Sequence, residues 1–299
     1  MSTLTTSKPA ASTHTARPIS RKKVLDGIKT VISHLVLIVG SFFFVVPLIF
    51  MISTSLKATR QIAKFPPELI PNPFIWGNYP DVFIYAPFFK YLLNTFFIIV
   101  PAVFGATVVS ALAAYAFARM RAPGKNLIFM VLLATLMLPG AVTLVPTYLL
   151  FNALGWVNTL LPLIVPSFFG SAFFIFMLRQ FYLTVPRELE EAAIIDGANP
   201  YQIWWRIMLP LSAPALATMA VFTFVSTYND FFTPLIYLTD DSKQTIAVAL
   251  SYFQGSPRVG PQMHLLMAAV ALSIVPPMAL FLVAQRYFVR GIATTGLKG

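Results

Sequence analysis

The run NLIFMVLLATLMLPGAVTLVPTYLLFNALGWVNTLLPLIVPSFFGSAFFIFML, residues 126–178, contains no charged side chain across 53 positions. A membrane-spanning helix needs about 20 apolar residues, so this run is too long for one span and long enough for two. Asparagine, glycine and tryptophan gather between positions 148 and 159 and interrupt the apolar pattern. We therefore predict two spanning helices with a hairpin in that stretch.

The composition of the whole chain also indicates a membrane protein. Of its 299 residues 58% are hydrophobic and 10% are charged, and the mean hydropathy is +0.77. Soluble domains are about 45–50% apolar and about 25% charged, so a soluble enzyme, a disordered protein and a fibrous protein are excluded. Cysteine is absent and the three histidines are scattered, so we expect no disulfide, no thiol nucleophile and no metal site.

Further apolar stretches at residues 30–56, 91–118, 213–238 and 265–284 bring the number of predicted spans to six. An even number of spans places both termini on one side of the membrane. That side carries fifteen Lys and Arg residues and the other side six, and cytoplasmic segments hold the excess of these residues. We therefore predict an all-α membrane protein with six transmembrane helices and both termini cytoplasmic. The basic residues form no single stripe, so no nucleic acid is expected as a partner.

The segments outside the spans differ in composition. Residues 1–29 are rich in Ser, Thr, Ala and Pro and are expected to form a disordered cytoplasmic tail before the first transmembrane helix at 30–56. Residues 57–90 are proline-rich and are expected to form an extended external loop. Residues 287–299 are expected to form a cytoplasmic C-terminal tail.

The second span carries small residues at every fourth position. These residues are Ala102, Ala106, Ser110, Ala114 and Ala118. The spacing aligns them on one helix face, where small side chains allow another helix to approach closely. The pattern predicts tight helix packing and leaves open whether the neighbour belongs to the same chain.

Asp230 is the one acidic residue within a predicted span, and it follows Asn229. A carboxylate inside a bilayer is costly unless it faces water or a partner, which favours a functional role. A structural hydrogen bond near the end of the span is the alternative. Asn229 and Asp230 are the sequence's candidates for the substrate path.

The segment VPRELEEAAIIDGANPYQIWWRIMLP, residues 185–210, is the most polar connection on the predicted cytoplasmic side. Pro186 and the glutamates after it suit the first turn of a helix. Gly197 can take the left-handed conformation that ends a helix, and Asn199-Pro200 supply the cap and first position of the next one. The segment therefore predicts two short helices joined by a tight turn, which is the form of a docking element.

This segment resembles the EAA loop of binding-protein-dependent ABC transporter permeases. The matching residues are Glu191-Ala-Ala, Gly197 four positions after Ala193, and Ile207-x-Leu-Pro210. The flanking sequence is similar to the carbohydrate subfamily of these permeases, and to its maltose G-type subunit in particular. The resemblance extends from the first span to the C-terminus.

The resemblance implies the type I fold of ABC importer permeases, with a permease core at residues 91–286 and a coupling loop at 180–212. In that family the loop docks into a cleft of a cytoplasmic ATPase and transmits closure of the ATPase to the membrane helices. The coupling residues that it implies are Glu190, Glu191, Ala192, Ala193, Asp196, Gly197, Ile207, Leu209 and Pro210.

A chain of this family is expected to import a sugar as a multi-pass subunit of the bacterial inner membrane, without being an enzyme itself. The sequence contains no phosphate-binding loop, so no cofactor is expected on this chain, and ATP and magnesium are expected on the ATPase. The implied partners are a second permease subunit in a heterodimer, two ATPase subunits, an extracytoplasmic solute-binding protein and membrane lipid.

Three other functions are compared with sugar import: import of another solute, a membrane-embedded enzyme and a stand-alone carrier. The same loop serves importers of other solutes, so a polyol or glycerol-phosphate compound is the alternative substrate. A membrane-embedded enzyme needs a cluster of His, Asp or Glu within the spans, and a stand-alone carrier needs charged groups for ion coupling. The spans hold Asp230 and isolated histidines, which disfavours both.

Overall fold

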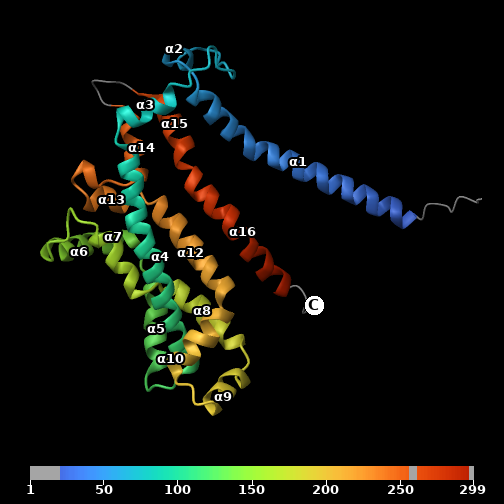
Figure 1. The fold of residues 1–299 in the computed structure, drawn as a ribbon, viewed down its shortest axis with the longest axis vertical. Helices are drawn as coiled ribbons and strands as arrows, with labels where there is room; N and C mark the ends of the chain where they lie inside the picture. Colours follow the sequence, from blue (N-terminus) through green and yellow to red (C-terminus); the bar gives the residue numbers. More distant parts are fainter. Residues whose placement is uncertain (1–20, 256–260, 296–299) are drawn as a thin grey trace, which may run out of the picture. The chain divides into compact units, whose positions relative to one another are not determined.

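The computed structural model describes residues 21–255 and 261–295, with side chains over 27–255 and 261–285. These residues are helical and contain no strand (Figure 1). Four helices are long and apolar enough to cross a membrane, and up to six spans result if each of two bent helix pairs counts as one. This number agrees with the six predicted spans. The chain divides into two units, residues 1–50 and 51–299.

The first unit consists of most of α1 (Arg21–Ser55), which contains the first predicted span. Because this helix begins at Arg21, the prediction of a disordered tail over residues 1–29 is wrong from Arg21 onward. No proline lies between Pro18 and Pro47, so nothing strongly stops the helix from extending back into the basic residues. The remainder of the expected tail, residues 1–20, lies outside the described residues.

The central helix of the second unit is α4 (Phe88–Arg119). It packs along α8 (Ala172–Thr184), the 3-10 turn η1 (Val165–Phe169) and α12 (Ala213–Tyr228). The predicted stripe of small residues on α4 is buried along its whole length, so the packing prediction is confirmed and the neighbours lie in the same chain. A Cβ atom at Gly105 would lie 2.8 Å from the Phe168 ring, so only glycine allows this close approach of α4 and η1.

The third predicted span is bent. Its two helices, α5 (Lys125–Thr135) and α6 (Gly140–Ala153), meet at an angle of 100°. Pro139 lies just before α6 and has no amide hydrogen to donate to a helix continuing through it. This break was not predicted. The interruption that was predicted at residues 148–159 is also present, because α6 ends at Ala153. The fourth span then comprises α7 (Leu161–Ile164), η1 and α8.

The prediction of an extended loop at residues 57–90 is wrong in part. The region contains the short helices α2 (Thr59–Ile62) and α3 (Asn78–Tyr85), and α3 packs against α15 (Met263–Ser273). The buried Asn78 amide fixes α3, because its Nδ2 atom donates to Ser55 O at 2.8 Å and to the next turn at Lys57 O at 3.0 Å. The helix α3 was not predicted because the contacts of Asn78 that hold it are made with residues more than 20 positions away in sequence.

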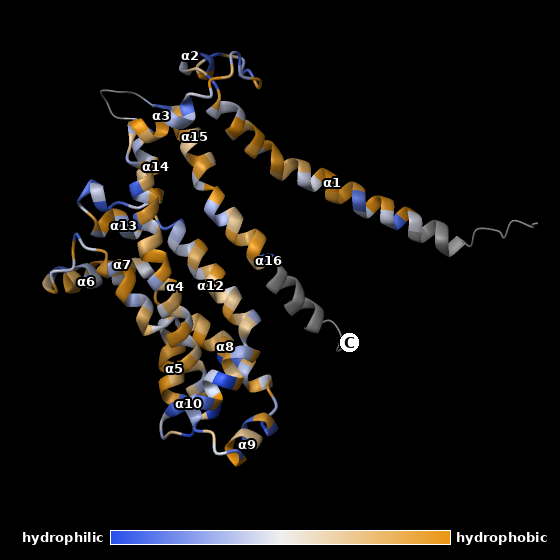
Figure 2. Cartoon of the chain, in the orientation of Figure 1, coloured by the Kyte–Doolittle hydropathy of each residue, from blue (hydrophilic) through white to orange (hydrophobic). Residues whose placement is uncertain are grey.

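The fifth and sixth predicted spans are each built from two helices. The fifth predicted range covers α12 and the short α13 (Phe232–Tyr237), with α14 (Ile246–Tyr252) following, whereas the bent pair that could cross the membrane there joins residues 200–211 to α12. The sixth covers α15 and α16 (Val275–Thr295). α16 thus continues into the expected C-terminal tail. Figure 2 shows apolar residues along α4, α5, α12 and α16, and more hydrophilic segments where α10 lies at one end of the unit. The fold therefore presents a polar end that lies beyond the apolar spans.

Candidate functional site

The polar loop folds as its sequence predicts. α9 (Glu188–Ile195) begins with three glutamates in its first turn and is followed by Gly197, whose φ of +80° is a left-handed value that favours glycine. α10 (Pro200–Ile203) begins with a capping box, because Gln202 N donates to Asn199 Oδ1 at 2.9 Å and Asn199 N donates to Gln202 Oε1 at 2.8 Å. The loop is therefore an ordered pair of short helices.

The loop is continuous with the fifth span. A π-helical turn, η2 (Trp204–Met208), and α11 (Leu209–Leu211) follow α10, and this segment meets α12 at 77°. Trp204 and Met208 are buried in a core that α4, α8 and α12 share. The loop is therefore joined to α12 through packed side chains rather than through a slack linker.

A second connection joins the loop to α4 and α8 through Arg119, the last residue of α4. Its Nη2 atom donates to Tyr182 O at 2.6 Å and to Val185 O, both at the end of α8. Its Nε atom lies 2.9 Å from Glu190 Oε1 in the first turn of α9, and these side chains are 4% and 14% exposed. Burial raises the pKa of the Glu190 carboxyl, and the Arg119 and Arg187 guanidiniums lower it by less. One arginine thus holds three helices together.

The remaining predicted coupling residues divide between the surface and the core. Glu191, Ala192, Asp196, Gly197 and Pro210 are exposed, Ile207 and Leu209 are partly buried, and Ala193 is buried. The buried Ala193 faces the bundle, whereas Glu191 and the turn face away from it. Only the exposed set is free to contact another molecule.

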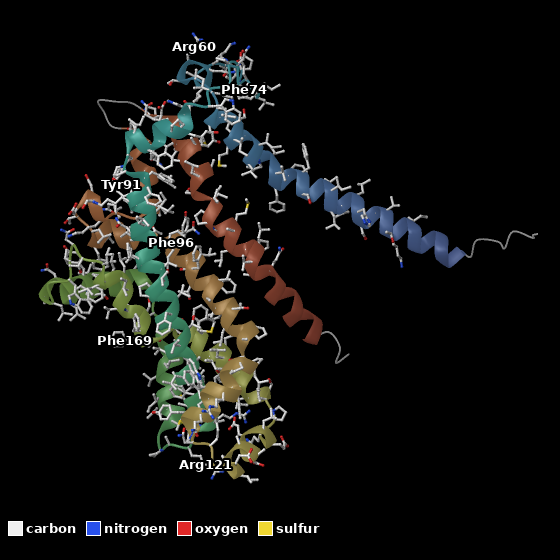
Figure 3. All side chains as sticks on the ribbon, in the orientation of Figure 1. Arg60, Phe74, Tyr91, Phe96, Arg121 and Phe169 are labelled. Carbon is white, nitrogen blue, oxygen red and sulfur yellow. The ribbon has the colours of Figure 1, made fainter. Side chains whose placement is uncertain are left out.

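Apolar side chains lie beside this exposed set. Ile195 is 85% exposed, and Leu189 and Ile194 are exposed as well. These residues belong to the same end of the unit as Arg121, which Figure 3 labels. A helix with exposed isoleucines next to glutamates, beyond the end of the apolar spans, has the composition of a protein-docking surface.

Two cavities of the bundle have volumes of about 440 Å³ and about 640 Å³, and the larger of the two has the more polar lining. It lies between α4, the junction of η1 with α8, and α12. Its lining is Ala106, Pro166, Ser167, Gly170, Ser171, Phe173, Phe174, Met177, Phe222, Thr223, Ser226 and Thr227. Hydroxyl groups and aromatic rings therefore share this cavity, and none of its lining residues is charged.

The predicted path residues Asn229 and Asp230 lie just beyond α12, next to Ser226 and Thr227 in sequence but outside the cavity lining. Asp230 Oδ1 accepts a hydrogen bond from Thr233 N at 3.0 Å, and Asn229 Nδ2 donates to Val225 O at 2.9 Å. Both side chains are thus engaged in local hydrogen bonds at the junction of α12 and α13. Their role in the substrate path stays a prediction.

Sequence reasoning did not identify Arg119 or the cavity hydroxyls as site residues. Arg119 was counted only as one of the basic residues that orient the chain, although it directly ends the stripe of small residues on α4. This position could have indicated a structural role for Arg119, because a charged side chain at the end of a tightly packed helix face must find partners.

Apolar spans around a partly polar cavity, with an ordered polar loop beyond them, are the arrangement of a membrane transport permease. The family model described as "Binding-protein-dependent transport system inner membrane component" matches residues 106–294. The chain belongs to this family. The predictions of a multi-pass inner-membrane protein and of an ABC importer permease rather than an enzyme are therefore confirmed.

Curated relatives match over nearly the whole chain. The sn-glycerol-3-phosphate transport system permease protein UgpE of Yersinia enterocolitica is 35% identical over 281 residues, which cover 92% of this chain and 98% of that protein. The diacetylchitobiose uptake system permease protein NgcG of Streptomyces coelicolor is 32% identical over 256 residues, which cover 85% and 84%.

Solved structures show the same fold. A chain of a bacterial ABC transporter involved in the import of the acidic polysaccharide alginate aligns with a TM-score of 0.78 at 24% identity, covering 91% of this chain and 100% of that chain. A chain of the bacterial alginate ABC transporter in complex with an alginate pentasaccharide-bound periplasmic protein aligns with a TM-score of 0.62 at 15% identity, covering 87% and 94%. The predicted ABC importer permease fold is confirmed.

Proposed function

We propose that this permease imports a carbohydrate and that the α9–α10 loop docks onto a separate ATPase, which supplies the energy. The observation that carries the proposal is the exposed surface of α9, where Glu191 stands beside the 85% exposed Ile195. Glu191 makes polar contacts with the ATPase, the alanines permit close approach, and Gly197 forms the turn. The excess of Lys and Arg supports a cytoplasmic position for this loop and for both chain termini.

The connections of the loop supply the mechanism. The contact between Arg119 and Glu190 ties α9 to α4, and η2 with α11 ties it to α12. Closure of the ATPase around nucleotide moves the docked loop, and the helices around the cavity follow it. The bundle then changes between inward-facing and outward-facing states, each favoured by the partner that binds it more tightly.

The complex contains more than this chain. Its further members are a second permease subunit that forms a heterodimer with this one, two ATPase subunits that bind ATP and magnesium, and an extracytoplasmic solute-binding protein. Membership of a binding-protein-dependent family supports the last of these. The carbohydrate substrate is supported by the sequence resemblance and by the named substrate of NgcG, and the alternative, a polyol or glycerol-phosphate compound, by that of UgpE.

The test is ATP-dependent uptake by the whole complex in membrane vesicles, comparing wild type with Gly197→Asp. Gly155→Asp is the matched control, because Gly155 has a similar φ of +69°, open space around it and a position outside the loop. We expect Gly197→Asp to abolish uptake while the chain still inserts in the membrane, and Gly155→Asp to retain it. Equal uptake by both variants would overturn the docking role of the loop.

A further inference from the structure

The larger cavity opens where the fourth span loses its helical geometry. η1 ends at Phe169, Gly170 has a φ of +77°, and α8 begins after Ser171. The interruption is built into the packing, because Ser171 N donates to Ser110 Oγ of α4 at 3.0 Å and a Cβ atom at Gly170 would crowd the same oxygen at 3.3 Å. Non-helical backbone at membrane depth is tolerated where it is buried in protein or lines a cavity that holds water or polar groups.

Five hydroxyl groups line this cavity, and among the described residues none of them is paired in a side-chain hydrogen bond. They belong to Ser167, Ser171, Thr223, Ser226 and Thr227. Thr223 Oγ1 also has no partner, but it is shielded from solvent and is not accessible to a solute in the cavity. Ser and Thr within helices commonly donate to the carbonyl four residues earlier.

Other threonines of this bundle do make that bond. Thr95 donates to Tyr91 O at 2.8 Å, Thr147 to Thr143 O at 2.6 Å, and Thr218 to Pro214 O at 2.9 Å. Thr218 lies on α12, the same helix as Thr223. The cavity hydroxyls therefore keep an unused hydrogen-bonding capacity, as do those of Thr54, Thr107 and Thr245 outside the cavity lining.

The cavity holds no group that would neutralise an anion. None of its lining residues is charged, and the cation of α8, Arg179, lies elsewhere. The Arg179 guanidinium is 4.3 Å from the centre of the Phe129 ring, and its Nε donates to Phe117 O at 3.3 Å. A phosphate or carboxylate within the membrane needs a cation or strong donors, so an anionic solute finds no counter-charge on this wall.

Aromatic surface completes the lining. Phe173 and Phe222 border the cavity and are 53% and 58% exposed. Their rings offer flat apolar faces in the same lining as the hydroxyls of Ser171, just before α8, and Ser226 on α12. Such a surface suits a molecule with both C–H faces and many hydroxyl groups.

We propose that this cavity is the solute contact of the chain, and that it accepts an uncharged polyhydroxylated solute, a sugar or polyol, in preference to a phosphorylated one. The unpaired hydroxyls exchange hydrogen bonds with those of the solute as it passes the interrupted fourth span. The inference rests on the proposed import function. It assigns the contact to Ser171 and Ser226, and it narrows the two substrate classes to the uncharged one.

The experiment uses the complete complex with its solute-binding protein at saturating concentration, so that capture does not limit the rate. Uptake of N,N′-diacetylchitobiose, maltose, glycerol and sn-glycerol 3-phosphate is measured for wild type, for the double variant Ser171→Ala with Ser226→Ala, and for Thr218→Val. Thr218→Val is the matched control, because it removes a hydroxyl of α12 that already has an intramolecular partner. ATP hydrolysis and recovery of the ATPase with the permease are measured in parallel.

Wild type should accumulate at least one of the uncharged solutes faster than sn-glycerol 3-phosphate. The double variant should lower the maximal uptake rate of that solute by about tenfold, since two hydrogen bonds are lost. ATPase recovery and the Thr218→Val control should be unchanged. Unchanged uptake in the double variant would overturn the assignment of the cavity as the contact site. A preference of wild type for sn-glycerol 3-phosphate would overturn the assignment of an uncharged solute. Neither result would contradict the importer function. Failure of wild type to couple any uptake to ATP would instead overturn the proposed function, and this inference with it.

Discussion

Arg119 Nε at the end of α4 lies 2.9 Å from Glu190 Oε1 in the first turn of α9. In sequence the two residues are separated by α5, α6, α7, η1 and α8, and their side chains are 4% and 14% exposed. The same guanidinium binds the last carbonyls of α8. The α9–α10 loop is therefore held against α4, the central helix of the second unit.

Replacing Arg119 with alanine should destabilise this end of the bundle. Glu190 would be left buried without its counter-charge, and removing one partner of a buried pair costs about 3–5 kcal/mol. Thermal unfolding of the purified complex should show a lowered midpoint, and uptake should fall further than ATP hydrolysis because the loop no longer transmits its motion. Arg121→Ala is the control, since Arg121 is exposed on the adjoining connection. Equal midpoints for the two variants would contradict the role of the pair.

Glu190→Gln should show a pH-dependent gain in stability. Burial raises the pKa of the Glu190 carboxyl above its ordinary value of 4.5, so its ionised form is disfavoured in the folded protein. As pH rises from 4.5 through the raised pKa, the unfolded chain loses this proton first, and the folded state becomes less stable relative to it. The difference in unfolding midpoint between Glu190→Gln and wild type should therefore be more positive at pH 7 than at pH 4.

The opposite pH trend would show that the attraction of Arg119 exceeds the cost of burial. Glu68 provides the comparison, because hydrogen bonds from Lys64 and Gln61 lower the pKa of its exposed carboxyl. For Glu68 the stabilising contribution is present above its ordinary pKa and is lost as pH falls through the lowered one. Glu68→Gln should accordingly lose more stability relative to wild type at pH 7 than at acid pH.

The sequence predicted the parts of the site whose causes are local. Gly197, Asn199 and Pro200 act on neighbouring backbone, so the turn and the second short helix could be inferred from their order. The apolar runs likewise predicted the spans, because length and hydropathy decide them. The interruption at Pro139 was missed because prolines within membrane helices bend some spans and leave others continuous.

The contacts that give the site its chemistry were not predictable in this way. Arg119 meets Glu190 only after α5, α6, α7 and α8 have packed, and no pattern in the sequence pairs the two residues. The cavity draws Ser171 from one span and Ser226 from another, and each looks like an ordinary membrane serine when taken alone. Only the structure shows which hydroxyls lack a partner.

Gly105→Ala should lower stability and slow uptake. The new Cβ atom would lie 2.8 to 3.0 Å from three atoms of the Phe168 ring, closer than such atoms approach one another, so η1 must shift beside the cavity. Overpacking of this kind costs about 1–3 kcal/mol. Unfolding midpoint and uptake rate are the measurements. Gly140→Ala is the control, because nothing lies within 4 Å of its added atom, and a loss in Gly140→Ala as large as in Gly105→Ala would contradict the close-approach argument.

Ile195→Asp should release the ATPase from the permease. Ile195 is 85% exposed at the end of α9, so the substitution removes apolar contact area without disturbing the core. An aspartate placed there also adds a carboxylate that must lose its hydration on docking, which raises the cost of binding. Ile195→Leu is the conservative control, because it keeps the apolar surface. Recovery of the ATPase with the purified permease should drop for Ile195→Asp and persist for Ile195→Leu, with the unfolding midpoint of the permease unchanged in both. Full recovery of the ATPase with Ile195→Asp would mean that α9 does not carry the docking surface.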